Sequence, residues 1–519
     1  MTDSQTRFRS LMQAMQRESF YPHPVEMPIT CVQTHCSAVF LTGNYAYKLK
    51  KPVDFGFLDY STPAKRHHFL QEELRLNLPV APDIYCQVIP LRYCDHQWQW
   101  GDEGETGEDY ALQMRQFPQE CLLSSLFEQG KLTDNHIIQL GKRVADFHRQ
   151  TPTNDEITAF GDPDVVWRSV ANNFKATEKY IGTAQTQSQF DQTQQFCEGF
   201  YQHQSAVFQQ RQAQGKIREC HGDLHLRNLC DWHGNIQLFD RIEFNQPFRF
   251  VDVMYDVAFT VMDLTAKGRS DWAYLFLNTY LEQTGDWQGL TVLPFYLCRQ
   301  AYVRAKVTSF LLDDPDLPPE EKQAALISAQ QYYQLAWQYS QPVWGKIILM
   351  AGLSGSGKST LAQSLSLQLP AVWIRSDGVR KQLGGVDLTQ TGDQQLYTPA
   401  MTERVYQTLF NLGQLARDAG FNVILDAKFD RIEWRSPFVS LAQEQGVNLH
   451  ILHCQAPLDV LTQRLRHRQA DISDATADLL PAQQAQWQGF TELETPFVRE
   501  VDTQQADWQA AILDEILRN

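Results

Sequence analysis

Residues 349–362 read LMAGLSGSGKSTLA: an apolar strand-like run, a glycine-rich turn and the start of a helix. The fixed positions of the G-x-x-x-x-G-K-S pattern are filled by Gly352, Gly357, Lys358 and Ser359. In that pattern backbone N–H groups surround phosphates, the lysine reaches the β- and γ-oxygens, and the serine hydroxyl ligates Mg²⁺. The stretch therefore predicts an α/β P-loop NTPase domain with a parallel sheet. The other residues expected at this ATP site are Ser354, Gly355, Ser356 and Thr360.

Two acids follow strand-like runs downstream of this loop. AVWIRSD at residues 371–377 ends in Asp377, and the run of FNVILDAKF ends in Asp426. Because ligands gather at the carboxyl ends of parallel strands, both acids should face the phosphate loop. We expect Asp426 to organise Mg²⁺ and Asp377 to act on an acceptor, with Arg380 binding a substrate anion. The alternative for Asp377 is a cap on the helix begun by GVRKQL.

Two arginines of LDVLTQRLRHRQADISDA, residues 458–475, are spaced for one helix face. Arg464 and Arg468 are four positions apart and are candidates for a catalytic lid that brings cations to the transferred phosphate. The alternative is a solvated basic helix face.

A second chemical motif, HGDLHLRN at residues 221–228, precedes the P-loop by more than a hundred residues. It places an aspartate suited to accept a hydroxyl proton, Asp223, five positions before Asn228, an amide suited to hold Mg²⁺. The following LCDWHGNIQLFD predicts a hairpin about His233 and Gly234. Folding about that turn brings Asn228 near Asp240, which predicts a magnesium site for ATP.

These residues carry a resemblance over residues 30 to about 335. This part is similar to the aminoglycoside phosphotransferase and choline kinase branch of the protein-kinase-like fold. The resemblance implies that Asp223 is the catalytic base, that Asn228 and Asp240 bind magnesium, and that His221 and His225 shape the loop.

The resemblance also implies a strand lysine that binds the ATP phosphates and pairs with a helix glutamate. AVFLTGNYAYKLKK at residues 38–51 predicts a hairpin, and Lys48 in it matches that lysine, with Lys50 on the same face of the strand. The glutamate is Glu72 or Glu73, on the helix predicted for HHFLQEELRLN. The alternative is an exposed lysine and an ordinary surface carboxylate. The family's glycine-rich loop is missing, because LTGN has one glycine.

Three further acids lie near the second motif. Asp252 and Asp256 match the place of the family's structural acid, and we expect a structural role for them. Glu243 follows Asp240 closely, and either joins the metal site or caps the next turn.

Composition limits the class of protein. The 519 residues, 43% hydrophobic and 12% aromatic, predict a globular chain of two or three domains. We expect an α+β bilobal domain at residues 1–335, with its small lobe to about 117 and its large lobe at 118–335. A linker at 336–345 and a P-loop kinase-like domain at 346–519 follow. A net charge of -16 disfavours extended nucleic-acid binding.

The ten cysteines form no CxxC pair, and no apolar run is long enough to span a bilayer, so we expect a cytoplasmic protein without membrane contact. The oligomeric state stays open.

The C-terminal part resembles P-loop kinases grouped with zeta-toxin-like proteins, gluconate kinase and polynucleotide kinase 5′-phosphoryl domains. The whole chain is similar to bacterial proteins in which an aminoglycoside phosphotransferase-like domain is fused to an AAA-type ATP-binding domain. We therefore expect an ATP-dependent kinase with Mg²⁺ and two ATP sites, each acting on a hydroxyl acceptor. Two alternatives stay open: a P-loop half that is a regulatory ATPase switch, and a first half that is a non-catalytic binding module.

Overall fold

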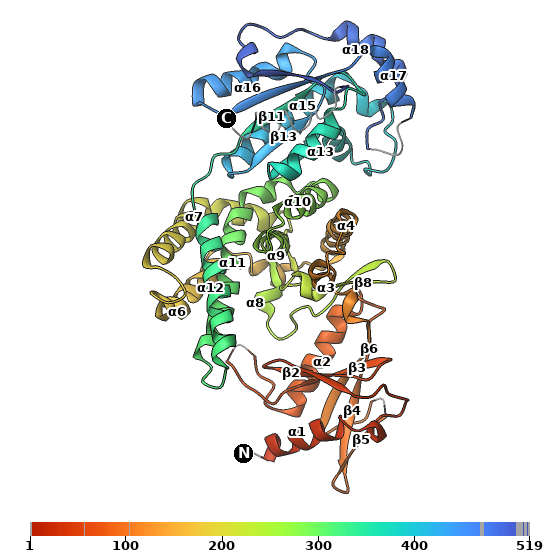
Figure 1. Ribbon diagram of the computed structural model, residues 1–519, viewed down its shortest axis with the longest axis vertical. Coiled ribbons are helices and arrows are strands. Elements are labelled where there is room, and N and C mark those ends of the chain that lie inside the picture. The colour runs from red at the N-terminus through yellow and green to blue at the C-terminus, as the bar shows by residue number, and fades with distance from the viewer. Residues whose placement is uncertain are drawn as a thin grey trace. The chain divides into compact units, whose positions relative to one another are not determined.

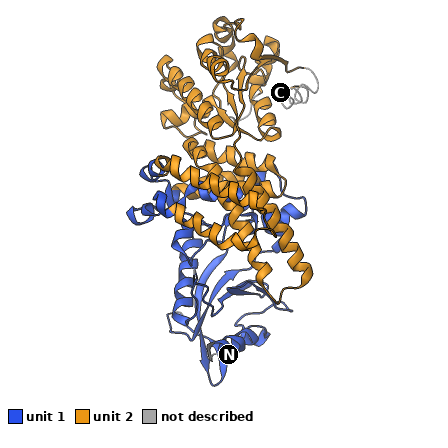
Figure 2. Cartoon of the chain, turned by 90° about the vertical axis from the view of Figure 1, so that its left-hand side faces the viewer, with its two compact units in different colours: residues 1–136, 150–165, 209–260 blue, residues 137–149, 166–208, 261–519 orange. Residues whose placement is uncertain are grey.

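The computed structural model in Figure 1 falls into two compact units, coloured in Figure 2. The first comprises residues 1–136, 150–165 and 209–260, and the second comprises 137–149, 166–208 and 261–519. Within these limits the structure describes residues 3–56, 58–102, 104–467, 472–504, 512 and 516. The second unit thus joins helices of the predicted first domain to the predicted P-loop domain.

The first unit is built on a six-stranded antiparallel sheet in the order β1-β2-β3-β6-β4-β5. Its strands are β1 (Thr30–Gln33), β2 (Ser37–Leu41), β3 (Tyr45–Lys50), β4 (Tyr85–Cys94), β5 (Gln97–Trp100) and β6 (Asp109–Arg115). The predicted hairpin around Gly43 is confirmed as β2 and β3. Helix α2 (Pro63–Asn77) packs on β4 and β6, and its buried face carries Leu70, Glu73 and Leu76. The sheet therefore faces a helix that buries a charged side chain.

The HGDLHLRN motif of the first unit lies between two short strand pairs. Strand β7 (Ile217–Glu219) pairs with β10 (Phe250–Asp252), and β8 (Leu229–Trp232) pairs with β9 (Asn235–Leu238). The second pair is the predicted hairpin, whose turn holds His233 and Gly234 at positive φ. Other helices that begin in this unit are α1 (Asp3–Ala14), α3 (Leu123–Glu128), α4 (Asp134–Gln150), α5 (Asp155–Ala159), α6 (Pro163–Thr177), α8 (Gln246–Arg249) and α9 (Val253–Ala266).

Long helices precede the P-loop in the second unit: α7 (Gln187–Ala213), α10 (Ser270–Thr284), α11 (Leu293–Phe310) and α12 (Pro319–Tyr339). Helix α12 ends at Tyr339. The segment predicted as a linker from residue 336 is therefore helical in its first four residues. The helix continues because Ala336 is buried and residues 336–339 contain no helix breaker.

The P-loop part of the second unit contains a five-stranded parallel sheet in the order β12-β13-β11-β14-β15. The strands are β11 (Ile347–Ala351), β12 (Ala371–Arg375), β13 (Asn422–Asp426), β14 (Leu449–Gln455) and β15 (Val498–Asp502). Around it lie α13 (Lys358–Gln368), α14 (Ser376–Gly384), α15 (Pro399–Asp418), α16 (Ile432–Gln445), α17 (Leu458–Arg466) and α18 (Leu480–Gln486). Every residue of β11 is buried, as expected for a central parallel strand. The predicted fold class, α+β followed by an α/β P-loop domain, is confirmed.

Among the described residues, no helix is both long enough and apolar enough to cross a membrane.

Candidate functional site

The loop of the HGDLHLRN motif is held by Asp256. The Oδ atoms of this fully buried acid accept hydrogen bonds from the backbone N–H groups of His221 (2.7 Å) and Gly222 (2.8 Å). Gly222 has a φ of +88°, and a Cβ there would lie 2.6 Å from the carbonyl oxygen of Phe248. The loop therefore requires glycine at this position. Asp256 has the structural role expected of it.

Asp223 lies at the exposed end of this loop. Its side chain is 35% exposed, and its Oδ2 lies 3.3 Å from His225 Nε2. Asn228 Nδ2 donates to the Asp223 backbone oxygen (3.0 Å) and to its Oδ2 (3.2 Å). The carboxylate is thus oriented by two neighbours and still open to a hydroxyl from solvent, as a general base must be.

Asp240 follows β9 in a left-handed backbone conformation, with φ at +61°. Its backbone N–H donates to the Tyr85 hydroxyl at 3.1 Å, and its Oδ1 accepts from Lys48 Nζ at 2.7 Å. Desolvation acts to raise the pKa of this carboxyl, but the Lys48 charge and hydrogen bond outweigh it, so the pKa lies below its usual value. Asp240 is therefore held ionised beside the lysine.

Glu73 binds two lysines at once. Its Oε1 accepts from Lys48 (2.7 Å) and its Oε2 from Lys50 (2.8 Å), and the Glu73 side chain is fully buried. Glu72 instead pairs with Arg75 at 2.9 Å and Arg249 at 3.5 Å. Of the two glutamates left open by the sequence, Glu73 is the partner of Lys48.

Lys50 extends this buried network to Glu243, an acid whose place could not be predicted. Lys50 Nζ donates to Glu243 Oε1 at 2.5 Å, and the Tyr60 hydroxyl donates to the same oxygen. The Lys50 ammonium also lies 4.8 Å from the Tyr60 ring centroid. The described contacts of the Glu243 carboxylate are thus with Lys50 and Tyr60. They place it neither in the metal site of Asp240 nor in a turn cap.

Asp252 has a structural role too. It forms a buried ion pair with Arg211, at 2.5 Å from Nε, and accepts the backbone N–H of Met254 at 2.9 Å.

The phosphate loop in the second unit leads from β11 into α13. Gly352, Gly355 and Gly357 all have positive φ, and a Cβ on Gly352 would lie 2.4 Å from the Cys454 carbonyl oxygen. Lys358 Nζ donates to the carbonyl oxygen of Leu353 at 2.7 Å, which folds the lysine back over the loop. The loop has the tight shape of a phosphate-binding turn, although the N–H groups of Ser354 and Ser356 donate to Gln483 Oε1 (3.0 Å) and to the Leu353 carbonyl oxygen (3.3 Å).

Asp426 ends β13 next to this loop, and it is paired in register with Met350 of β11. Its carboxyl accepts a hydrogen bond from Ser359 and one from Trp373 Nε1, at 3.3 Å. Burial raises the pKa of Asp426, although Lys358 and the Ser359 hydrogen bond oppose the rise. A buried acid joined to a hydroxyl offers the oxygen ligands that Mg²⁺ prefers, so both residues fit this ion.

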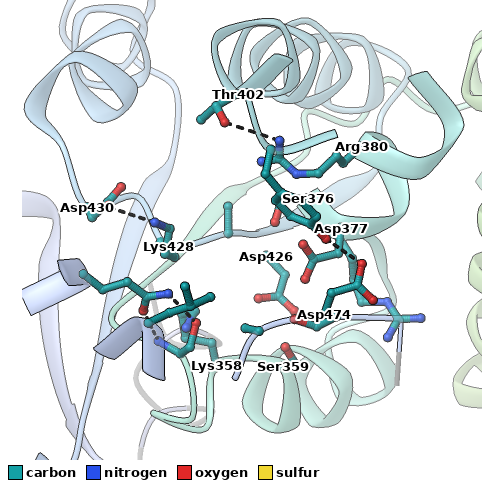
Figure 3. A pocket seen from close by; sticks show the side chains of 18 of the residues that line it. Lys358, Ser359, Ser376, Asp377, Arg380, Thr402, Asp426, Lys428, Asp430 and Asp474 are labelled. Atoms are coloured by element: carbon teal, nitrogen blue, oxygen red, sulfur yellow. Dashed lines mark hydrogen bonds and ion pairs between the residues drawn. The ribbon is translucent and has the colours of Figure 1, made fainter. Parts of the chain in front are cut away.

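A cavity of about 1610 Å³ opens over the loop, and Figure 3 shows its lining. Asp377 lies in this lining with Asp426, Lys358 and Ser359. Its placement corrects one expectation: β12 ends at Arg375, so Asp377 lies in the first turn of α14 and not at the strand end. The N-cap residue of α14 is Arg375, so Asp377 is not the capping residue but an acid in the first turn.

Arg380 lies one turn further along α14 and is largely buried. Its Nη1 donates to the Leu396 carbonyl oxygen at 2.8 Å and to Thr402 Oγ1 at 3.3 Å. The cavity wall also contains Lys428 and Asp430, which pair at 3.1 Å. Neither was predicted, although their position directly after Asp426 on the same loop would have pointed to them.

Arg464 is hydrogen-bonded to the phosphate loop and to Thr503. Its Nη1 donates to Thr503 Oγ1 (2.9 Å) and to the Gly355 carbonyl oxygen (3.3 Å). Helix α17 ends at Arg466. Arg468 lies outside the described residues.

Residues 347–490 match a family described as AAA domain. This segment is a P-loop domain. It begins at β11 and contains the phosphate loop, Asp377, Asp426 and Arg464.

Relatives span nearly the whole chain. "Uncharacterized protein Rv2004c" of Mycobacterium tuberculosis is 28% identical over 501 residues, covering 94% of this chain and 98% of that protein. The same values hold for "Uncharacterized protein Mb2027c" of Mycobacterium bovis. The similarity to these proteins therefore extends over both halves of the chain.

Solved structures resemble parts of the chain. A choline/ethanolamine kinase family protein from Mesorhizobium loti is 10% identical, with a TM-score of 0.37, and covers 64% of this chain and 99% of its own. The Mycobacterium tuberculosis APS kinase CysC, in complex with AMPPNP and APS, is 22% identical, with a TM-score of 0.25, and covers 34% of this chain and 100% of its own.

Proposed function

We propose that the chain is an ATP-dependent phosphotransferase with two ATP sites, each of which transfers the γ-phosphoryl group to a hydroxyl. The observation that carries the proposal is the repetition of one chemical set in two units. Lys48 stands with Asn228 and Asp240 in the first unit, and Lys358 stands with Ser359 and Asp426 in the second. Each set combines a cation for phosphate oxygens with oxygen ligands suited to Mg²⁺.

In the first unit, Asp223 is the proposed general base. It accepts the proton of the acceptor hydroxyl, whose oxygen forms the new bond to the γ-phosphorus as ADP leaves. Asn228 donates through Nδ2 to Asp223, which leaves its amide oxygen to ligate Mg²⁺ together with Asp240. Mg²⁺ bound there would neutralise charge on the phosphate oxygens. Lys48 exchanges Asp240 for the phosphates while Glu73 keeps hold of its ammonium group.

In the second unit, the N–H groups of the phosphate loop and Lys358 bind the β- and γ-phosphates, and Ser359 and Asp426 hold Mg²⁺. Asp377 acts on an acceptor hydroxyl that enters the cavity over the loop. Arg464, tied to Gly355, adds positive charge at the end of the site where phosphate binds. This half is proposed to phosphorylate a small-molecule or nucleic-acid hydroxyl.

One observation favours a second candidate for the first half, a binding module that transfers nothing. Lys48 is already neutralised by Glu73 and Asp240, and the sequence has no glycine-rich loop to cover the phosphates. Such a module would use the loop of Asp223 to bind a ligand without cleaving ATP.

A transfer assay separates these candidates. Purified full-length protein is incubated with ATP labelled in the γ-phosphoryl group and a panel of hydroxyl metabolites and RNA ends, and products are identified by mass spectrometry. Two-site transfer predicts one labelled product that Asp223→Asn removes and one that Asp377→Ala removes. A single labelled product, removed by Asp377→Ala and kept by Asp223→Asn, would favour the binding module for the first half. Release of labelled phosphate only, at the same rate with and without any acceptor, would contradict transfer by both halves.

A further inference from the structure

A positive charge lies beside the proposed metal ligand of the P-loop. Arg375 of β12 is paired in register with Asp426 of β13, and neighbouring strands lie about 4.8 Å apart. Trp373, two residues earlier and thus on the same face of the sheet, donates to Asp426 at 3.3 Å, and its ring centroid lies 4.9 Å from the Arg375 guanidinium carbon. Arg375 and Asp426 both line the cavity over the phosphate loop. The arginine is within reach of the acid.

Arg375 is nevertheless bound to a different carboxylate. Its Nε donates to Glu282 Oε1 at 2.6 Å and its Nη2 to Glu282 Oε2 at 2.5 Å, a two-bond geometry that fixes the plane of the guanidinium. The two side chains are only 19% and 18% exposed, so water screens the pair weakly. Glu282 belongs to α10, which precedes the P-loop by about 70 residues in sequence.

Helix α10 is anchored to the edge strand that carries Arg375. Asn278 Nδ2 donates to the Ala371 carbonyl oxygen at 3.0 Å, and its Oδ1 accepts the Trp373 N–H at 3.0 Å. Gln382 of α14 donates to the backbone oxygen of Glu282 at 2.8 Å. These bonds are independent of the Glu282 carboxylate, so they hold α10 in place whether or not that side chain is charged.

We infer that Glu282 is a positioning residue of the P-loop site: it holds Arg375 away from Asp426 and so leaves that acid free for Mg²⁺. The inference rests on the proposed function, in which Asp426 and Ser359 are the metal ligands. Without the Glu282 charge, Arg375 is expected to pair with Asp426, its partner in strand register, and so to compete with the metal. Helix α10, which precedes the linker in sequence, thereby sets the metal affinity of the P-loop site that follows the linker.

The test titrates Mg²⁺ into full-length protein and measures binding of a fluorescent, non-hydrolysable ATP analogue. The component that Lys358→Ala removes is assigned to the P-loop. Glu282→Gln should raise the Mg²⁺ concentration for half-saturation of this component about tenfold, the scale of one gained competing ion pair. Adding Arg375→Gln to that variant removes the competitor and should return the value to within about threefold of wild type.

A control variant tests whether any damage to this contact has the same effect. Gln382→Ala breaks the bond to the Glu282 backbone and that to Trp287 without touching Arg375, and should leave the Mg²⁺ dependence unchanged. If Glu282→Gln does not fold, the Arg375→Gln variant alone tests the inference. Its Mg²⁺ affinity at the P-loop should equal or exceed that of wild type.

Three results would overturn the inference: wild-type Mg²⁺ dependence in Glu282→Gln, no recovery in the double variant, or lower Mg²⁺ affinity in Arg375→Gln. In each of them wild-type protein still shows Mg²⁺-dependent binding at the P-loop, so the proposed metal site stands. If wild-type protein shows none, the metal site proposed for Asp426 is wrong and the inference fails with it.

Discussion

The ammonium group of Lys48 lies 2.7 Å from Oδ1 of Asp240, so a cation proposed to bind phosphate neutralises an acid proposed to bind metal. The Asp240 side chain is 45% exposed, whereas the partner on the other side of Lys48, Glu73, is fully buried. Exchange at Lys48 is therefore easier on the Asp240 side, because Mg²⁺ and phosphate from solvent can reach it. The buried contact with Glu73 persists.

Glu73 and Glu72 offer a matched pair for testing this arrangement. Glu73→Gln leaves Lys48 and Lys50 short of a buried counter-charge and should lower the free energy of unfolding by about 3–5 kcal/mol. Glu72→Gln, whose pair with Arg75 is partly exposed and whose contact with Arg249 is long at 3.5 Å, should lower it by at most about 1 kcal/mol. Chemical denaturation of both variants measures the difference, and equal losses would show that Glu73 is not the anchor of the two lysines.

Asp223→Asn should leave ATP binding by the first unit nearly unchanged, because Asp223 is not among its proposed metal ligands. Transfer to the acceptor should fall by roughly 10²–10⁴-fold, the scale of lost general-base catalysis. Single-turnover rates with labelled ATP measure the loss. A wild-type rate in this variant would remove Asp223 from the chemistry.

The sequence predicted the parts of both sites that are local in the chain. The P-loop, the hairpin after Asn228 and the acid at the end of β13 each follow from a short pattern whose geometry is nearly fixed. The choice between Glu72 and Glu73 could not be made, because adjacent helix residues both lie near the sheet and only packing decides which is buried.

Contacts between residues that are far apart in the sequence could not be predicted for the same reason. Nothing near Glu243 indicates that it binds Lys50, 193 positions away. The anchoring of α10 on β12 likewise depends on Asn278 and Ala371, which are 93 positions apart and whose residue types are common. The end of α17 at Arg466 could not be predicted either, because an i,i+4 charge pattern does not determine where a helix ends.

Asp426→Asn should stabilise the P-loop half at neutral pH when Mg²⁺ is absent. Burial raises the pKa of Asp426 above the ordinary 3.8, so the folded state binds its proton more tightly than the unfolded state. The charged acid then opposes folding at neutral pH, and this cost disappears as pH falls through the raised pKa. At pH 7 the melting temperature of the variant should exceed that of wild type, by roughly 2–4 °C for each kcal/mol gained in the free energy of unfolding. The difference in melting temperature should disappear as the pH is lowered.

The same variant should bind nucleotide less well with Mg²⁺, roughly tenfold or more, because a metal ligand is lost. Thermal scans at several pH values and Mg²⁺ titrations measure the two effects. A lower melting temperature at pH 7 together with unchanged Mg²⁺ dependence would contradict both the burial argument and the metal assignment.

Asp377→Ala should keep the ATP affinity of the P-loop and lower acceptor-dependent turnover by about 10²-fold or more. Glu433→Gln is the control, because Glu433 also lines the cavity but is exposed and paired with Arg431 at 3.0 Å. It should change turnover little. Steady-state rates with an identified acceptor separate the two acids, and equal effects in both variants would place Asp377 outside the reaction.

The number of ATP sites is the most direct test of the account, and isothermal titration calorimetry of the full-length chain with Mg²⁺ and a non-hydrolysable ATP analogue measures it. Wild-type protein should bind two molecules per chain, and Lys358→Ala should bind one, with the affinity of the remaining site unchanged. One molecule bound by wild type and none by Lys358→Ala would contradict the account, because the unit that contains Lys48 and Asp240 would then bind no ATP.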